Sequence, residues 1–261
     1  MPDFDSLSPG TFCWPELATT DQTAGVAFYR KLFGWDLNEQ QMGPDGVYSM
    51  FQLRGREVAA ACSLRPEERQ HGVPPHWNSY VSVASADDAV KRAQELGGKV
   101  LAPAFDVMDA GRMAVLQDPT GAVFQVWQAG RHSGARVLGE PGALCWTELA
   151  TRDPAAAKNF YTSLFGWKAK SSSDAGMNYT EFSVGQTPGA GMMEMDERMA
   201  GVPPHWMPYF MAADVDQTAA KAKELGATQI VPPGDIPKVG RFSVIRDPQG
   251  AVFAIFKPAR A

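Results

Sequence analysis

Two glutamates stand at equivalent places in two similar stretches of the sequence. Glu16 lies in CWPELAT and Glu148 in CWTELAT, 132 positions further along, and each directly precedes a leucine. A carboxylate in such an apolar segment is costly to bury without a partner. One interpretation makes each glutamate a general base or a hydrogen-bond acceptor for a ligand. The other pairs it with an arginine, such as Arg112 or Arg241 of the repeated Gly-Arg dipeptide.

The elements that must position these glutamates come from a tandem duplication. A second matched block starts GVPPHW at Gly72 and Gly201 and ends in DPTGAVF and DPQGAVF. Each copy predicts the order strand, helix, three strands twice; its first helix starts after an N-cap such as Asp21 and ends at a glycine such as Gly34. We therefore expect an α+β protein with domains at 1–130 and 143–261, joined by a glycine-bearing linker at 131–142.

Composition narrows the class of protein. With 44% hydrophobic and 20% charged residues, the chain has the composition of a globular protein. A net charge of −5 without a basic run argues against nucleic acid or an anionic membrane as partner. No apolar stretch is long enough to span a bilayer, the first ten residues lack signal-peptide features, and three cysteines do not form a disulfide framework. These features predict a cytoplasmic protein.

The repeated motifs resemble those of a known family. The D…FY…LFGW helix, the DPxGAxF strand and the paired units are similar to the vicinal oxygen chelate superfamily, which includes glyoxalase I, extradiol dioxygenases and bleomycin-binding resistance proteins. The resemblance covers nearly the whole chain and is greatest to a two-domain glyoxalase-like subgroup often labelled hydroxylases. It implies four βαβββ units that form two curled β-sheet cups with helices outside. These motifs are specific for the fold and say little about the reaction.

The resemblance also implies where metal ligands would lie, on the first, fifth and eighth strands of each cup and sometimes on the fourth. These positions are Glu16, Asn78 and Gln125 in the first copy and Glu148, Met207 and Ala254 in the second, with Ala61 and Met192 near the fourth-strand position. Amides are weak ligands, and a thioether with a methyl group would leave a divalent ion unsatisfied. We therefore expect no native transition metal and no other cofactor.

Strand alternation around these positions predicts what each cup contains. The first cup would hold Trp14, Glu16, Asn78, Tyr80, Gln125 and Trp127, and the second Trp146, Glu148, Met207, Tyr209, Ala254 and Phe256. Large aromatic faces with a few polar groups are typical of a pocket for a flat organic molecule. The alternative is that these aromatic residues fill the concave face as core, or as an interface between the domains.

His76 and His205 are repeat equivalents that lie two residues before the fifth-strand position. Alternation predicts that both are on the cup side of the sheet, near its rim. One interpretation makes them ligand-binding residues or general bases that face the cavity. The other is that each closes the turn after a Pro-Pro pair and forms a hydrogen bond with the backbone.

Three functions are compatible with such cups. The first is an isomerase or lyase acting on a carbonyl or aromatic metabolite, with Glu16 as base and Asn78 or Gln125 as oxyanion donor. The second is a binding module that sequesters an aromatic metabolite or an antibiotic. The third, a metal-dependent glyoxalase or dioxygenase, requires ligands that the sequence does not supply. We expect a small-molecule partner and a monomer of two pseudo-symmetric domains or a weak homodimer.

Overall fold

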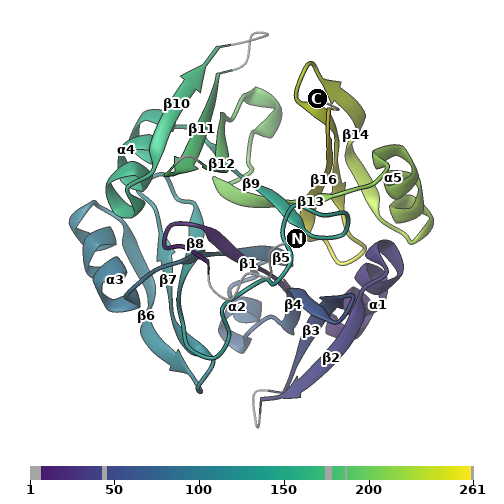
Figure 1. Ribbon diagram of the computed structural model, residues 1–261, viewed down its shortest axis with the longest axis horizontal. Coiled ribbons are helices and arrows are strands. Elements are labelled where there is room, and N and C mark those ends of the chain that lie inside the picture. Colours follow the sequence, from purple (N-terminus) through teal and green to yellow (C-terminus); the bar gives the residue numbers. More distant parts are fainter. Residues whose placement is uncertain (1–6, 43–45, 174–177, 186, 260–261) are drawn as a thin grey trace.

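The computed structural model describes residues 7–42, 46–173, 178–185 and 187–259, which form two eight-stranded sheets with helices (Figure 1). The first half of the chain contains β1 (Phe12–Thr19), α1 (Gln22–Phe33), β2 (Asp36–Gln41), β3 (Val47–Leu53), β4 (Arg56–Ser63), α2 (Pro66–Gln70), β5 (His76–Ser82), α3 (Ala86–Glu95), β6 (Lys99–Val107), β7 (Gly111–Gln117) and β8 (Val123–Ala129). The second half contains β9 (Leu144–Thr151), α4 (Pro154–Phe165), β10 (Lys168–Ser172), β11 (Tyr179–Val184), β12 (Thr187–Glu194), β13 (His205–Met211), α5 (Val215–Glu224), β14 (Thr228–Ile236), β15 (Gly240–Arg246) and β16 (Val252–Pro258). Among all the residues that the structure describes, no helix is long and apolar enough to cross a membrane.

Each sheet is built from two βαβββ units, as predicted. The strand order is β2-β3-β4-β1-β5-β8-β7-β6 in the first sheet and β10-β11-β12-β9-β13-β16-β15-β14 in the second. The antiparallel pairing of β1 with β5 joins the two units of the first sheet, and β9 pairs with β13 in the same way in the second. The glutamates therefore lie on central strands, flanked on both sides by neighbouring strands.

The first helix of each half begins and ends where the sequence predicts. Asp21 accepts a hydrogen bond from the Ala24 N–H at the start of α1. At the start of α4, Asp153 accepts one from the Ala156 N–H. Gly34 and Gly166 end these helices with φ values of 72° and 68°. A left-handed backbone of this kind favours glycine, since a Cβ atom would be strained there.

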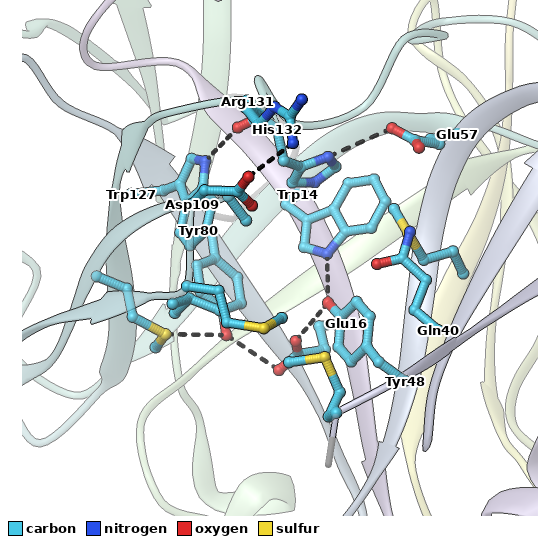
Figure 2. Close-up of a pocket in the computed structure, with 16 residues that line it drawn as sticks. Trp14, Glu16, Gln40, Tyr48, Glu57, Tyr80, Asp109, Trp127, Arg131 and His132 are labelled. Carbon is cyan, nitrogen blue, oxygen red and sulfur yellow. Dashed lines mark hydrogen bonds and ion pairs between the residues drawn. The ribbon is translucent and has the colours of Figure 1, made fainter. Parts of the chain in front are cut away.

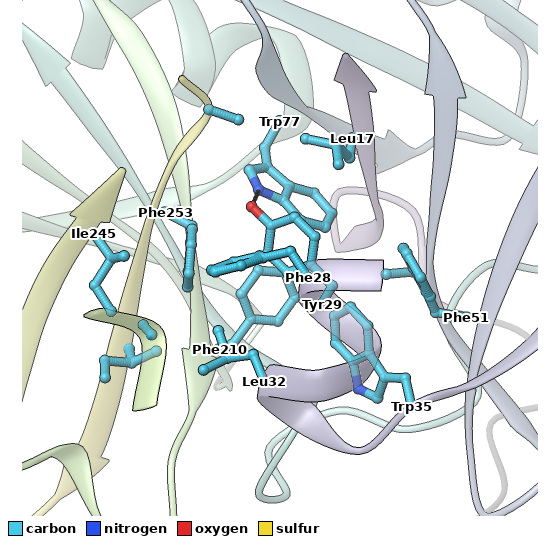
Figure 3. Packing of buried hydrophobic residues seen from close by; sticks show 14 of the residues in the cluster. Leu17, Phe28, Tyr29, Leu32, Trp35, Phe51, Trp77, Phe210, Ile245 and Phe253 are labelled. Atoms are coloured by element: carbon cyan, nitrogen blue, oxygen red, sulfur yellow. Dashed lines mark hydrogen bonds between the residues drawn. The ribbon is translucent and has the colours of Figure 1, made fainter. Parts of the chain in front are cut away.

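The helices cover the outer face of each sheet, and this face is also where the two halves meet. In Figure 1, α1 lies beside α5, and α3 lies beside α4. Tyr29 and Trp35 of the first half pack in one hydrophobic cluster with Phe210 and Phe253 of the second (Figure 3). The ring centroids of Tyr29 and Phe253 are 5.4 Å apart. The interface between the halves is therefore on the helix side of the sheets, and the opposite face of each sheet does not form it.

Two motifs that both copies share, the FY helix and the Asp-Pro turn, form reciprocal hydrogen bonds across this interface. The Tyr29 hydroxyl donates to Asp247 at 2.9 Å, and the Tyr161 hydroxyl donates to Asp118 at the same distance. Each tyrosine accepts in turn from a tryptophan of its own half, Trp77 in the case of Tyr29. Burial raises the pKa of both tyrosines well above the usual value, which keeps them protonated as donors.

The segment predicted to be a linker is packed against the first sheet. The Ala135 N–H donates to the Cys13 carbonyl at 2.7 Å, and the Arg136 N–H donates to the Glu57 carbonyl at 2.8 Å. Ala135 and Val137 are almost completely buried. This segment therefore forms a wall of the first half as well as connecting it to the second.

Candidate functional site

A cavity of about 350 Å³ opens on the face of the first sheet that points away from the helices (Figure 2). We call this cavity cup one and the equivalent face of the second sheet cup two. Four aromatic residues, four methionines, five charged or titratable residues and three others line cup one: Trp14, Tyr48, Tyr80, Trp127, Met42, Met50, Met108, Met113, Glu16, Glu57, Asp109, Arg131, His132, Gln40, Val107 and Ala110.

Glu16 lies at the inner end of cup one and accepts three hydrogen bonds. The Tyr48 hydroxyl donates to Oε2 at 2.7 Å, and the Tyr80 hydroxyl and the Asn78 amide donate to Oε1 at 3.0 and 3.2 Å. The pairing of β1 with β5 sets these contacts, because it places Asn78 directly opposite Glu16. Glu16 is only 9% exposed, so these three neutral donors replace most of its water.

The direction of these hydrogen bonds is fixed by a fourth contact. The Trp14 indole N–H donates to the Tyr48 hydroxyl oxygen at 2.9 Å, which leaves the single Tyr48 hydrogen for Glu16. Burial, followed by the charge of Glu16, raises the pKa of Tyr48 and of Tyr80 well above the usual value. Both hydroxyls therefore stay protonated and act as hydrogen-bond donors to Glu16.

The two amides predicted to face a ligand lie behind Glu16 and do not line the cavity. Gln125 Nε2 donates to Asn78 Oδ1 at 2.7 Å, so the two side chains hold each other while Asn78 holds Glu16. His76 lies at the rim, with Nε2 3.2 Å from Asn78 Oδ1 and Nδ1 2.9 Å from the Pro74 carbonyl. His76 thus makes the backbone contact of one interpretation and reaches Glu16 only through Asn78. The amides and this histidine act on the orientation of the carboxylate.

The outer wall of cup one comes from the segment after β8. The His132 ring lies edge-on to Trp14, with centroids 4.5 Å apart, and the Trp127 indole N–H donates to the His132 carbonyl at 2.9 Å. The Trp127 indole ring packs directly over Gly111 of β7, where a Cβ atom would be 2.5 Å from the ring. Trp14 and Trp127 are consequently only 4% and 7% exposed.

Cup two keeps the central glutamate with fewer donors. The Tyr209 hydroxyl donates to Glu148 at 2.6 Å, and Tyr179, which accepts from the Trp146 indole at 3.0 Å, also forms a hydrogen bond with Glu148. Met207 lies opposite Glu148, where cup one has an amide. Burial raises the pKa of Glu148, and the two tyrosine hydrogen bonds oppose that rise. The buried Glu148 carboxyl therefore holds its proton more tightly than an exposed glutamate does.

The walls of cup two are more open than those of cup one. Trp146 and Phe256 are half-buried, while Ala254 packs with Met207 and Tyr209 in a small apolar cluster. His205 contacts the Pro203 carbonyl at 2.9 Å, and burial lowers its pKa. The second copy thus provides an aromatic, apolar face with little polar structure around its glutamate.

The interpretation that pairs the glutamates with arginines is wrong. Arg112 forms ion pairs with Asp87 and Asp106 at the surface, and Arg241 forms the equivalent pairs with Asp216 and Asp235. Both arginines lie near the start of their strands, β7 and β15, and contact solvent-exposed acids of the neighbouring helix and strand. Hydroxyl and amide donors, rather than guanidinium groups, surround the two buried carboxylates.

Twelve of the sixteen residues that line cup one were not predicted from the sequence, and two of them, Tyr48 and His132, contact Trp14. Tyr48 was missed although Tyr179 is its repeat equivalent, and the shared tyrosine of the YSMF and YTEF segments was the available signal. His132 was left unassigned because it falls in the segment predicted to be a linker. No sequence signal of the kinds used above would have found it, since its position depends on how that segment packs.

Comparison with known proteins identifies relatives of the whole chain. The model of the Glyoxalase/Bleomycin resistance protein/Dioxygenase superfamily matches residues 11–126 and 143–255. The putative glyoxylase CFP32 of Mycobacterium tuberculosis is 45% identical over 261 residues, 99% of each chain. The anthracycline biosynthesis protein DnrV of Streptomyces peucetius is 36% identical over 259 residues, 95% of this chain and 94% of its own. A Mn(II)-bound glyoxalase from Novosphingobium aromaticivorans shares the fold, with a TM-score of 0.66, 16% identity and coverage of 95% of this chain and 82% of the other.

The residues at the positions of metal ligands do not fit a divalent transition metal. In cup one they are Glu16, Asn78 and Gln125, and the oxygen of Asn78 already accepts from Gln125. The register places Ala60 beside Glu16, one residue before the expected Ala61, so the fourth strand adds only a methyl group. Within the described ranges, no group of three or more His, Cys, Asp or Glu residues could hold an ion. One carboxylate with two amides is a poor donor set for such a metal.

Cup two offers still fewer donors at the equivalent positions. Glu148 is accompanied by Met207 and Ala254, and the register places Gly191 beside it, one residue before the expected Met192. A Cβ atom at Gly191 would be 1.8 Å from the Tyr179 hydroxyl, so this strand position is occupied by the tyrosine. A single carboxyl group with sulfur and methyl neighbours would leave a divalent ion without its ligands.

Proposed function

The chain belongs to the glyoxalase/bleomycin resistance protein/dioxygenase superfamily, and on that premise we propose that cup one binds a small, flat aromatic or carbonyl-containing molecule. The size of the cavity supports this proposal. Ligand pockets have volumes of about 300–1,000 Å³, and cup one is at the small end of that range. Its four aromatic side chains offer ring faces and edges, and its four methionines offer an adaptable apolar wall.

One observation carries the proposal: a glutamate side chain opens into an aromatic cavity and is held there by neutral donors alone. Glu16 accepts from Tyr48, Tyr80 and Asn78, and it also lines the cavity. A fixed carboxylate on an apolar wall gives a ligand one strong, directional contact. An arrangement that served only to fill the core would bury this carboxylate for no gain in stability.

Sequestration of an unchanged ligand fits the cavity better than an isomerase or lyase reaction does. Enolisation needs a base and also a donor aimed at the oxygen that becomes negative. Asn78 and Gln125, the expected donors, are engaged behind Glu16 and do not line cup one. Glu16 remains the candidate base if a reaction occurs, with Glu148 as its counterpart in cup two.

Titration of the protein with small aromatic and carbonyl compounds tests the proposal. The names of the relatives suggest an anthracycline and a 2-oxoaldehyde mixed with a thiol as members of the probe set. We expect saturable binding that Trp14→Phe weakens about threefold or more, because an indole face and edge are lost from the wall. The matched control Trp146→Phe, in cup two, should leave the affinity unchanged.

Two results would contradict this account. Loss of binding in Trp146→Phe with full binding in Trp14→Phe would place the ligand in cup two. Recovery of a product in place of the added ligand, with loss of turnover in Glu16→Gln, would show an enzyme instead of a sequestering protein. Mass spectrometry of the ligand after incubation separates these outcomes.

A further inference from the structure

The charges that line cup one are paired at its mouth and unpaired at its inner end. Three carboxylates face one arginine and one histidine in the lining. Asp109 pairs with Arg131 at 2.7 Å, and Glu57 lies 3.3 Å from the His132 ring nitrogen. Among the residues that the structure describes, no cationic side chain forms an ion pair with Glu16. Its charge is therefore left to hydroxyl and amide donors.

Two basic side chains on neighbouring elements, Arg65 and His76, are already engaged elsewhere. The Arg65 guanidinium donates a hydrogen bond to Glu68, which is the main cause of its raised pKa. It interacts with the charge of Glu16 without a direct contact. His76 contacts the Pro74 carbonyl and Asn78 and does not reach Glu16. Neither group lines the cavity.

The indole and phenol groups that line cup one have no free donor left. The Trp14 indole donates to Tyr48, both tyrosine hydroxyls donate to Glu16, and the Trp127 indole donates to the His132 carbonyl. A ligand group that only accepts hydrogen bonds, such as a carbonyl or carboxylate, finds no free donor among these four side chains and would have to reach Gln40, Arg131 or His132 elsewhere in the lining. A group that donates finds a carboxylate with remaining acceptor capacity.

We propose that cup one selects an aromatic ligand that carries a protonated amine, with the ammonium group directed at Glu16. This inference rests on the proposed function and specifies its ligand. The ammonium group supplies the positive charge that the protein does not, and a charged donor forms a stronger hydrogen bond to a carboxylate than a neutral one. The faces of Trp14 and Tyr80 beside Glu16 also attract a cation. An anionic ligand at the inner end would meet Glu16 as a like charge.

Cup two provides the natural comparison. Its Glu148 is also held by tyrosines, but the aromatic residues beside it, Trp146 and Phe256, are half-buried, whereas Trp14 and Trp127 of cup one are buried. Water therefore screens a charge pair more strongly in cup two than in cup one. The selectivity for a cation should therefore belong to cup one.

Three naphthyl probes of nearly equal size test the charge preference. They are 2-(1-naphthyl)ethylamine as the cation, 2-(1-naphthyl)ethanol as the neutral molecule and 1-naphthaleneacetate as the anion. Each is titrated at pH 7 into ¹⁵N-labelled protein, and the indole N–H signals of the seven tryptophans report where it binds. Trp→Phe variants assign the signals of Trp14, Trp127 and Trp146.

We expect the cation to shift the Trp14 and Trp127 signals with an affinity about tenfold or more above that of the alcohol, because a charged pair replaces a neutral contact. The anion should bind most weakly. Equal affinities of cation and alcohol, or tightest binding of the anion, would overturn the inference while leaving the proposed function intact. If none of the three probes shifts these two signals, the proposed function fails along with the inference.

Glu16→Gln and its matched control Glu148→Gln locate the source of the preference. Glu16→Gln keeps an oxygen acceptor and removes the charge, so the affinities for cation and alcohol should become equal within about twofold. Glu148→Gln should keep the preference of the wild-type protein. A preference that persists in folded Glu16→Gln, or disappears in Glu148→Gln, would contradict the assignment; the wild-type ranking stands as a test even if Glu16→Gln does not fold.

Discussion

Replacing Tyr48 with phenylalanine tests whether the hydroxyl between Trp14 and Glu16 holds cup one together. The change removes a 2.7 Å hydrogen bond from Tyr48 to the Glu16 carboxylate. It also leaves the indole N–H of Trp14, a residue that is only 4% exposed, without its acceptor. A hydrogen bond to a charged group contributes about 1.5–3 kcal/mol, and an unpaired buried donor costs about 1–3 kcal/mol. Because the two effects share one hydroxyl, we expect Tyr48→Phe to lower the free energy of unfolding by about 2–4 kcal/mol.

The equivalent change in cup two is the matched control. Tyr179 makes the same two contacts, with Trp146 and Glu148, but the tryptophan is half-buried and its N–H can turn to water. The loss in Tyr179→Phe should therefore be smaller, because only the hydrogen bond to Glu148 is lost and no buried donor is left unpaired.

Urea unfolding and thermal melting measure the difference between the two variants. For a chain of this size, each kcal/mol shifts Tm by roughly 2–4 °C, so Tyr48→Phe should melt about 4–16 °C below the wild type. Tyr179→Phe should melt closer to the wild type. Losses equal to within about 0.5 kcal/mol, or a larger loss for Tyr179→Phe, would refute the reasoning that the buried hydroxyl of cup one is the more critical.

Three further predictions follow from the same contacts. Tyr29→Phe removes one interdomain hydrogen bond and should lower the free energy of unfolding by about 1–3 kcal/mol, with a similar loss for Tyr161→Phe in urea unfolding; an effect of only one of them would contradict the reciprocal interface. Asn78→Met copies Met207 of cup two, so it should weaken binding to cup one in ligand titrations and lower the free energy of unfolding by about 1–3 kcal/mol, because Gln125 loses its acceptor; unchanged affinity in the folded variant would show that the amide does not orient the carboxylate. The raised pKa of Glu148 means that the folded protein holds this proton more tightly than the unfolded chain, so its contribution to stability is lost as the pH rises above about 4.3, the usual value for glutamate. Glu148→Gln should therefore gain stability relative to the wild type between about pH 4 and neutrality in urea titrations, and a relative loss over that range would contradict the direction of the shift.

The fold could be predicted from the sequence because its signals are local and repeated. The FY helix with its N-cap and terminal glycine, and the Asp-Pro turns, each act within a few residues, and each occurs twice. Alternation along β1 likewise predicts that Trp14 and Glu16 share a face, and both line the cavity. The role of these side chains in binding stays a prediction.

The contacts between distant segments could not be predicted in the same way. The partners of Glu16 depend on which strand lies beside β1 and on where β3 curls over it, so the sequence did not predict Tyr48, and an arginine partner was left open as one of two interpretations. The fourth-strand position was displaced by one residue, from Ala60 to Ala61, and one residue moves a side chain to the other face. His132 reaches cup one through the packing of residues after β8, which no strand or helix pattern encodes.

The central claim is that cup one is a ligand site organised around Glu16. A crystal structure of the protein with the probe that binds most tightly tests this claim most directly. The account predicts electron density for the ring between Trp14 and Trp127, with a donor atom of the probe within hydrogen-bond distance of a Glu16 carboxylate oxygen. Density for the probe in cup two or at the surface, with cup one filled only by water, would contradict it.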